Sequence, residues 1–405
     1  MIMNKLMTRI INLPGVVVEK IQETENTLIL FVKSTNKTAV CPGCGQTSHR
    51  LHQNKRYLVK DLPLSNREVI LSVNRRRFKC QKCQKPFSEV LYFVFKKFTI
   101  RYAQSITQQI IHSDLKNVAH HNGLTAEEVD SMVMYYCQVI YPLELSNLRK
   151  LGIDEISLVK GQGKFIVVLV DLDSHKLIGL VSERKQQSIK KVMLTWGEKV
   201  LKQIEEVSMD MTGNYKSLIN KICPNADVTV DRFHVTKLIH EELNQARINP
   251  KQVAQSLALK EKTKLLDGLK GSKYTLLKSE NQLSQSQIER LQKVKLASPL
   301  VVTMHSLKEE FHQLFEKNHK LGQGIIELID WLKKAKFYYK KTVKTIERWL
   351  AEVAGYFEQR TTNGVVEGIN NKLKLLKRCG FGFRSFHNFQ ARALLFWHFP
   401  NILAQ

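Results

Sequence analysis

The fold is decided by the sequence KLGIDEISL (residues 150–158), which is followed by KFIVVLVD (164–171) and LIGLV (177–181). Each segment is short and rich in aliphatic and β-branched residues, a composition typical of buried β-strands. We therefore predict three successive strands in this part of the chain.

Helices and strands alternate after these three segments. The pattern predicts a helix over residues 188–204, a strand that ends at Asp210, a helix over 215–222 and a strand over 227–233. Three strands followed by helix, strand, helix and strand is the order of an RNase H-like core. We therefore predict an α/β fold of this kind.

Four of the seven cysteines form two Cys-x-x-Cys pairs, Cys41/Cys44 and Cys80/Cys83. A two-residue gap lets both sulfur atoms of a pair face one ion, so two such pairs predict a structural Zn²⁺ site. Alternating apolar residues over 15–33 predict a β-hairpin ahead of the first pair. Together these features indicate a zinc ribbon.

A helical pattern over residues 99–141 breaks at NGLT (122–125). Thr125 followed three residues later by Glu128 is the signal of a capping box. A small residue before the break, the glycine within it and an apolar residue after it stand at the spacing of a helix-turn-helix. We predict a recognition helix over residues 125–135, and ordinary helical packing is the alternative.

The predicted elements divide the chain into five segments. A segment rich in Lys and Gln, with little strand signal, is interpreted as an all-α insertion that interrupts the core. The expected segments are the N-terminal β segment and zinc ribbon (1–95), the helix-turn-helix (96–146), the first part of the core (147–237), the insertion (238–354) and the last helices of the core (355–405).

The charge of the chain indicates a polyanionic partner. Lys and Arg number 63 against 37 Asp and Glu, a net charge of +26 that is spread along the whole sequence. A membrane-binding protein would concentrate such charge on one helix or tail, so nucleic acid is favoured. The expected DNA contacts are Thr125 of the recognition helix and cations of the ribbon and of the last segment: Arg75, Arg76, Arg77, Lys79, Lys374 and Arg378.

The sequence also carries an expectation about location. No apolar run reaches the roughly 18 residues that a membrane helix requires, and the N-terminus has no signal-peptide pattern. We therefore expect a cytoplasmic, nucleoid-associated protein with no membrane partner.

Three carboxylates stand where a metal-dependent site would require them. Asp154 lies in the middle of a predicted strand, where an uncompensated carboxylate would be costly. Asp210 ends a strand, and the carboxyl ends of strands usually carry the site of an α/β sheet. Glu367 is the one acidic residue of segment 361–405. We predict that they hold two Mg²⁺ or Mn²⁺ ions about 3.5–4 Å apart.

Other readings of these residues are weaker. Each aspartate alone could be a capping or turn residue, and Glu155 is expected to face away from Asp154 because side chains alternate along a strand. The sequence contains no motif typical of a nucleophilic triad, a Walker loop or a dinucleotide-binding fingerprint. Trp331 and Trp349 could stack on displaced bases, but a core or interface role is favoured.

These motifs resemble those of bacterial insertion-sequence transposases of the ISL3 family. The resemblance covers essentially the whole chain. It includes GIDEI (152–156) and MDM (209–211), and its most specific block is NGVVEGINNK (363–372) with KRCGFGF (377–383).

The resemblance implies an acidic triad at Asp154, Asp210 and Glu367. The sequence DRFH (231–234) is similar to the Asp-x-x-His motif of related transposases, which makes Asp231 and His234 neighbours of the active site. It also implies that the N-terminal modules bind terminal inverted repeats, that the protein cleaves the strand at each element end, and that the 3′-hydroxyl attacks target DNA. A homodimer or higher homo-oligomer on double-stranded DNA is expected, because two ends must be held together.

Two alternative functions remain open from the sequence. One is a non-catalytic DNA-binding regulator that uses only the zinc ribbon and the helix-turn-helix. The other is an RNase H-like nuclease that cleaves RNA or branched DNA without strand transfer.

Overall fold

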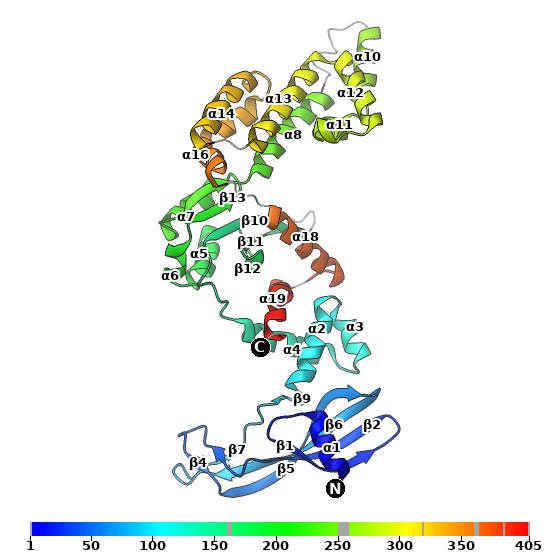
Figure 1. Ribbon diagram of the computed structural model, residues 1–405, viewed down its shortest axis with the longest axis vertical. Helices are drawn as coiled ribbons and strands as arrows, with labels where there is room; N and C mark the ends of the chain where they lie inside the picture. Colours follow the sequence, from blue (N-terminus) through cyan, green and yellow to red (C-terminus); the bar gives the residue numbers. More distant parts are fainter. Residues whose placement is uncertain are drawn as a thin grey trace. The chain divides into compact units, whose positions relative to one another are not determined.

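The chain folds into two compact units. The computed structural model describes residues 2–159, 164–249, 259–317, 320–359, 364–383 and 385–403. One unit contains residues 1–142 and 375–405, and the other contains residues 143–374. Figure 1 labels most of the helices and strands of both units.

A seven-stranded sheet forms the base of the first unit, with the strand order β1-β2-β6-β5-β9-β8 and β7 paired to β6. The antiparallel pair β1 and β2 confirms the predicted hairpin. A helix that the sequence did not predict, α1 (Ile2–Ile11), precedes the sheet. The strands are β1 (Val16–Glu23), β2 (Thr27–Ser34), β5 (Leu51–Leu64), β6 (Arg67–Lys79), β7 (Pro86–Ser88), β8 (Val94–Phe95) and β9 (Phe98–Thr99), with a separate small pair β3 (Ala39–Val40) and β4 (Thr47–Ser48).

Four helices complete the first unit: α2 (Ile100–Ile111), α3 (Leu115–His121), α4 (Ala126–Ile140) and α19 (Phe386–Leu403). The predicted capping box is present at the start of α4, where Thr125 and Glu128 exchange hydrogen bonds. Gly123 has a φ of +61° in the turn between α3 and α4, a conformation that favours glycine. The predicted break at 122–125 and the helix after it are therefore confirmed, but the segment before the break is divided into α2 and α3, because the side chain of Asp114 caps α3.

The C-terminal helix α19 packs against α2 and α4. The buried guanidinium of Arg392 donates to the carbonyl oxygens of Ile110 and Ser113 at the end of α2. This places a cation where a helix leaves its last carbonyl groups without internal partners. We expected residues 355–405 to stay together as the last helices of the core, whereas the chain divides between the two units after Lys374.

The second unit is built on a five-stranded sheet with the order β12-β11-β10-β13-β14. The first three strands in the chain pair antiparallel, and β13 and β14 join them parallel to β10. The elements are β10 (Lys150–Val159), β11 (Lys164–Asp171), β12 (Lys176–Val181), α5 (Gln186–Leu194), α6 (Glu198–Gln203), β13 (Glu206–Met209), α7 (Gly213–Ile222) and β14 (Asp227–Val230).

Two predicted elements of this unit have different bounds. The helix expected over 188–204 is divided into α5 and α6, because Gly197 adopts a φ of +89° between them. The strand expected over 227–233 ends at Val230, because the side chain of Asp231 accepts a hydrogen bond from the Phe233 amide and begins helix α8. The first residues after β14 are therefore helical.

The described residues in the remainder of the unit are mainly helical, as predicted for the insertion. The elements are α8 (Arg232–Ile248), α10 (Leu259–Leu269), α11 (Lys273–Leu277), the 3₁₀ turn η1 (Glu280–Gln282), α12 (Gln285–Ala297), α13 (Pro299–Glu316), α14 (Leu321–Ala335), α15 (Lys340–Arg348), α16 (Leu350–Ala354), α17 (Tyr356–Gln359) and α18 (Gly364–Cys379), which runs on into the first unit. No helix in the described part of the chain is long and apolar enough to cross a membrane.

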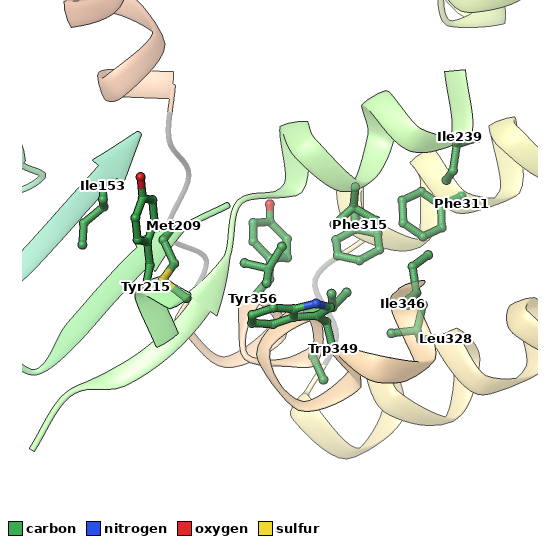
Figure 2. Packing of buried hydrophobic residues seen from close by; sticks show 14 of the residues in the cluster. Ile153, Met209, Tyr215, Ile239, Phe311, Phe315, Leu328, Ile346, Trp349 and Tyr356 are labelled. Atoms are coloured by element: carbon green, nitrogen blue, oxygen red, sulfur yellow. The ribbon is translucent and has the colours of Figure 1, made fainter. Parts of the chain in front are cut away.

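One hydrophobic core connects the sheet to the helical insertion. Figure 2 shows Ile153, Met209 and Tyr215 of the sheet region together with Trp349 and other aromatic residues of the insertion. Trp331 and Trp349 are both buried, and the Trp331 indole donates to the carbonyl oxygen of Leu307 at 2.8 Å. The core role that we favoured for the two tryptophans is confirmed.

The insertion should lose stability in mild acid through His305. Its side chain is buried on α13, and burial together with the positive charge of Lys308 lowers the pKa of His305 to about 4. Between that value and the usual 6.5, the unfolded chain binds a proton that the folded chain does not. The contribution of His305 to the free energy of unfolding is thus fully present above about pH 6.5. It decreases as the pH falls, by about 1 kcal/mol at pH 5.5.

Urea unfolding followed by tryptophan fluorescence at pH 7.5 and pH 5.5 measures this difference. The variant His305→Gln should show a smaller decrease between the two pH values than the unmodified protein. An equal decrease in both proteins would assign the acid sensitivity to other groups.

Candidate active site

Asp154, in the middle of β10, is level with Asp210 and Asp231, which directly follow the carboxyl ends of the adjacent parallel strands β13 and β14. Strands β10 and β13 pair with Gly152 opposite Ser208, so Asp154 and Asp210, each two residues further on, are level with each other. Strands β13 and β14 end together, and the residues that directly follow them are Asp210 and Asp231. The register of the sheet therefore gathers three carboxylates at one edge.

The imidazole of His234, on the first turn of α8, lies between these carboxylates. Its Nε2 is 3.7 Å from Asp154 Oδ1 and 3.8 Å from Asp231 Oδ2, and its Nδ1 is 3.5 Å from Asp210 Oδ1. Burial alone would lower the pKa of His234, but the adjacent carboxylates of Asp154, Asp210 and Asp231 outweigh it and raise this pKa. The site thus favours positive charge at its centre.

Helix α18 contacts the same strand at two points. The Asn370 side chain donates from Nδ2 to Asp154 Oδ2 at 2.7 Å. A β-carbon at Gly152 would lie only 2.7 Å from Val366 Cγ2, so the helix approaches this strand at a position that only glycine leaves open. Glu367 precedes Asn370 by three residues and is therefore on the same face of the helix.

Asn370 was not among the predicted site residues. The signal that could have identified it is its position one helical turn after the predicted glutamate. Glu367 itself is exposed to solvent, and no hydrogen bond or ion pair among the described residues joins it to Asp154 or Asp210. The structure thus brings Asp154, Asp210, Asp231 and His234 into contact, and it positions Glu367 only through its helix.

Glu155 faces away from this cluster, as predicted. Its carboxylate accepts a hydrogen bond from Tyr215 Oη at 2.5 Å and one from Arg184 at 3.3 Å. Tyr215 belongs to α7, whereas Asp154 accepts its hydrogen bond from α18. Figure 1 shows these two helices on opposite sides of the strands. Burial and the neighbouring Glu155 raise the pKa of Tyr215, so its hydroxyl remains a donor.

A second group of ligand atoms lies in the other unit. The sulfur atoms of Cys41, Cys44, Cys80 and Cys83 all lie within 4.8 Å of one another, and those of Cys44 and Cys80 are 3.6 Å apart. A tetrahedral zinc site with Zn–S bonds of about 2.3 Å requires sulfur separations of about 3.8 Å. The amide of Cys83 donates to Cys80 Sγ and lowers the pKa of that thiol to about 7. The four thiols therefore fit a structural Zn²⁺.

The cations predicted to contact DNA in the ribbon have different surroundings. Arg76 forms an ion pair with Glu89 at 2.6 Å in which both side chains are largely buried, so this residue holds the ribbon together. Arg75 lies over the ring of Tyr57 at 5.6 Å. Arg77 is exposed, and Lys79 is half-buried. The alternation of side chains along β6 explains why Arg76 differs from its two neighbours.

The remaining predicted DNA contacts lie on helices. Lys374 and Arg378 are exposed along α18. The hydroxyl of Thr125 accepts a hydrogen bond from the Glu128 amide at 3.3 Å, so this side chain caps α4. Its role in the helix is therefore structural, although the residue itself is exposed.

Comparison with known protein families gives two matches. A family model described as a transposase of the ISL3 type matches residues 151–393. A second model, described as the zinc finger of the transposases of IS204, IS1001, IS1096 and IS1165, matches residues 37–83. The second match contains all four clustered cysteines.

Individual relatives extend these matches. The chain is 25% identical over 404 residues to the transposase for insertion sequence element IS1001 of Bordetella parapertussis. The aligned region covers 95% of this chain and 96% of that protein. It is 26% identical to the transposase for insertion sequence element IS1557 of Mycobacterium tuberculosis, over 62% of this chain and 60% of that protein. A protein of Lactococcus lactis described as an ATP-dependent protease is 37% identical over 23% of this chain and 26% of its own length.

The transposase model spans more than half of the chain and includes Asp154, Asp210, Asp231 and helix α18. The similarity to the Bordetella protein covers nearly the full length of both chains. The chain belongs to the ISL3 family of transposases.

Proposed function

We propose that this transposase binds the terminal inverted repeats of its element and cleaves and joins DNA strands with two divalent metal ions held by Asp154, Asp210 and Glu367. The observation that supports this proposal most directly is the convergence of Asp154, Asp210 and Asp231 on one edge of the sheet, with His234 between them. Such a concentration of carboxylates is unfavourable unless cations balance it.

The topology of the sheet supports an RNase H-like core. Numbered along the chain, its strands stand in the order 3-2-1-4-5, with the first three antiparallel and the last two parallel to the first. In α/β sheets, sites lie beyond the carboxyl ends of the parallel strands, where Asp210 and Asp231 occur.

The donor set of this edge fits Mg²⁺ or Mn²⁺. Hard cations prefer carboxylate oxygen ligands, and the side chains of Asp154 and Asp210 remain 20% and 44% exposed. When bound, two ions would activate the attacking oxygen and stabilise the leaving oxygen of the phosphodiester. Glu367 would complete the ligand set from α18, because its helix face is the one that contacts Asp154 through Asn370.

His234 and Asp231 would act beside the metal ligands. The imidazole of His234 lies within 3.8 Å of all three aspartates, and in its protonated form it would stabilise negative charge on the scissile phosphate. Asp231 caps the first turn of α8 through the Phe233 amide at 3.2 Å, which holds His234 at the strand edge. The positive end of α8 adds to the attraction for phosphate.

The first unit supplies the proposed DNA-binding modules. Helices α3 and α4 would form the helix-turn-helix, with the exposed first turn of α4 at the base edges. The zinc ribbon, through Arg77, and helix α18, through Lys374 and Arg378, would contact phosphates. We further propose that the protein acts on nucleoid DNA in the cytoplasm as a dimer or higher oligomer, because strand transfer joins two ends.

The triad is tested by three variants that keep side-chain shape but remove charge. Asp154→Asn, Asp210→Asn and Glu367→Gln should each bind end DNA normally but lose nicking in Mg²⁺ or Mn²⁺ by at least about 10²–10³-fold. Cleavage assays with labelled end DNA measure nicking, and gel-shift assays with the same DNA measure binding.

Glu155→Gln is the matched control, because its amide oxygen can still accept the hydrogen bond of Tyr215. It should retain substantial cleavage. Full activity of all three triad variants would contradict a metal-dependent mechanism, and normal activity of Glu367→Gln alone would show that the third ligand is another residue.

The recognition helix is tested at Glu127, which is exposed in the first turn of α4 and takes no part in the capping box. Glu127→Gln should lower the ratio of end binding to random-DNA binding by about fivefold or more, since one base contact contributes about 1–3 kcal/mol to discrimination. The capping residues Thr125 and Glu128 stay unchanged, so the helix remains intact.

Glu144→Gln removes the same charge from an exposed position outside α4 and should leave that ratio unchanged. Competition binding with both DNAs measures it. If Glu127→Gln also leaves the ratio unchanged, sequence recognition lies in the zinc ribbon or elsewhere.

The zinc site is tested by metal analysis of the purified protein, which should contain about one Zn²⁺ per chain. Cys41→Ser and Cys80→Ser should lose the metal and weaken end binding, because each removes one of four thiolate ligands. Cys379→Ser, at the end of α18 and outside the cluster, should retain it. Native protein without zinc would contradict the assignment.

A further inference from the structure

We propose that Asn370 is a positioning residue of the metal site. Its amide orients the carboxylate of Asp154, and the same contact sets the rotation of α18 that directs Glu367 toward the ions. This inference rests on the proposed two-metal function, and it concerns a residue that would act through Asp154.

The first support is the hydrogen bonding of Asp154. Asn370 Nδ2 donates to Oδ2 at 2.7 Å, and the backbone amide of Glu155 donates to Oδ1 at 2.7 Å. Each carboxylate oxygen thus accepts one hydrogen bond, so the rotation of the group is restrained. A carboxylate has about four acceptor positions, so lone pairs remain for a cation.

The second support is the unsatisfied oxygen of the same amide. Asn370 is only 5% exposed, and its Oδ1 has no hydrogen-bond partner in the part of the chain that the structure describes. Leaving a buried acceptor unpaired costs about 1–3 kcal/mol, whereas an apolar side chain of the same size would avoid that cost. Packing alone therefore does not account for an asparagine at this position. A role beside the proposed metal site does, because the amide oxygen could accept a hydrogen bond from water bound to a cation.

The third support is the docking of the helix. Val366 packs against Gly152, and Asn370, four residues later, bonds Asp154 on the same strand. Two contacts one turn apart determine which face of α18 meets the strand. Glu367 lies between them in sequence and shares the face of Asn370. Loss of the amide contact would therefore let α18 rotate about its axis, and Glu367 would no longer be directed toward the ions.

The neighbouring residue provides a matched control. Asn371 is exposed, and its Oδ1 accepts from Lys374 Nζ at 3.5 Å on the solvent side of the helix. Asn371→Ala therefore removes the same amide group from the same helical turn without changing a contact of Asp154.

The experiment compares the full-length, zinc-loaded protein with Asn370→Leu, Asn370→Ala, Asn371→Ala and Asp154→Asn. Mn²⁺ binding is measured from the electron paramagnetic resonance signal of the free ion, and thermal unfolding and end-DNA binding are measured in parallel. Both Asn370 variants should weaken Mn²⁺ binding by about 10–100-fold, the usual effect of removing a group that orients a metal ligand. Asn371→Ala should bind Mn²⁺ like the unmodified protein.

Asn370→Leu separates positioning from a structural role. Leucine fills a similar volume and removes the unpaired oxygen, so this variant should be as stable as the unmodified protein or more stable, yet bind Mn²⁺ weakly. Nicking should recover in part at high Mn²⁺, because the ligands themselves remain.

Three outcomes decide the proposal. Normal Mn²⁺ binding by both Asn370 variants, with weak binding by Asp154→Asn, overturns the role of Asn370 and leaves the proposed function intact. Normal binding by Asp154→Asn as well overturns both. Equal weakening by Asn371→Ala would assign the effect to α18 in general and overturn the specific role of Asn370.

Discussion

Repulsion among the carboxylates that lie level with one another on three adjacent parallel strands is the constraint around which the unit of residues 143–374 is arranged. The sheet register places Asp154, Asp210 and Asp231 level with one another, and each additional negative charge raises the energy of the others. Three features compensate: the imidazole of His234, the amide of Asn370 and the positive end of α8. Under the proposed function, divalent cations and the DNA phosphate would balance the same negative charge, and this explains why a sheet would tolerate the arrangement.

A packed core lies behind these carboxylates and holds the strands that carry them in place. The core of the sheet continues into the helical insertion, so the residues behind the site share one packed interior (Figure 2). A half-buried ion pair between Lys216 of α7 and Glu352 of α16 further joins the two regions. In the other unit, Arg101 pairs with the buried Asp61 and also donates to the carbonyl oxygen of Ile11, which ties α1 to the sheet. The buried carboxylates of Glu352 and Asp61 therefore each have a cationic partner, as burial requires.

The sequence by itself determined the features that depend on local pattern and ligand chemistry. Alternating and continuous apolar runs predicted the β1–β2 hairpin and the five strands of the second unit, and Thr125 with Glu128 predicted the start of α4. Two Cys-x-x-Cys pairs predicted the four-thiol cluster, because the spacing alone orients two sulfur atoms. Asp154 and Asp210 could be selected because a carboxylate within or at the end of an apolar strand has few structural uses.

Only the tertiary structure decided which distant residues meet. Arg76 looked like its neighbours in sequence, but pairing with Glu89 across the sheet makes it a structural residue. Asn370 and Asp154 are more than 200 positions apart, and no local pattern specifies their contact. The division of residues 355–405 between two units likewise depends on the packing of α19 against α2 and α4. These features were beyond sequence reasoning because side-chain pairing between remote segments depends on how the helices and sheets pack, whereas caps, turns and cysteine pairs depend on residues a few positions apart.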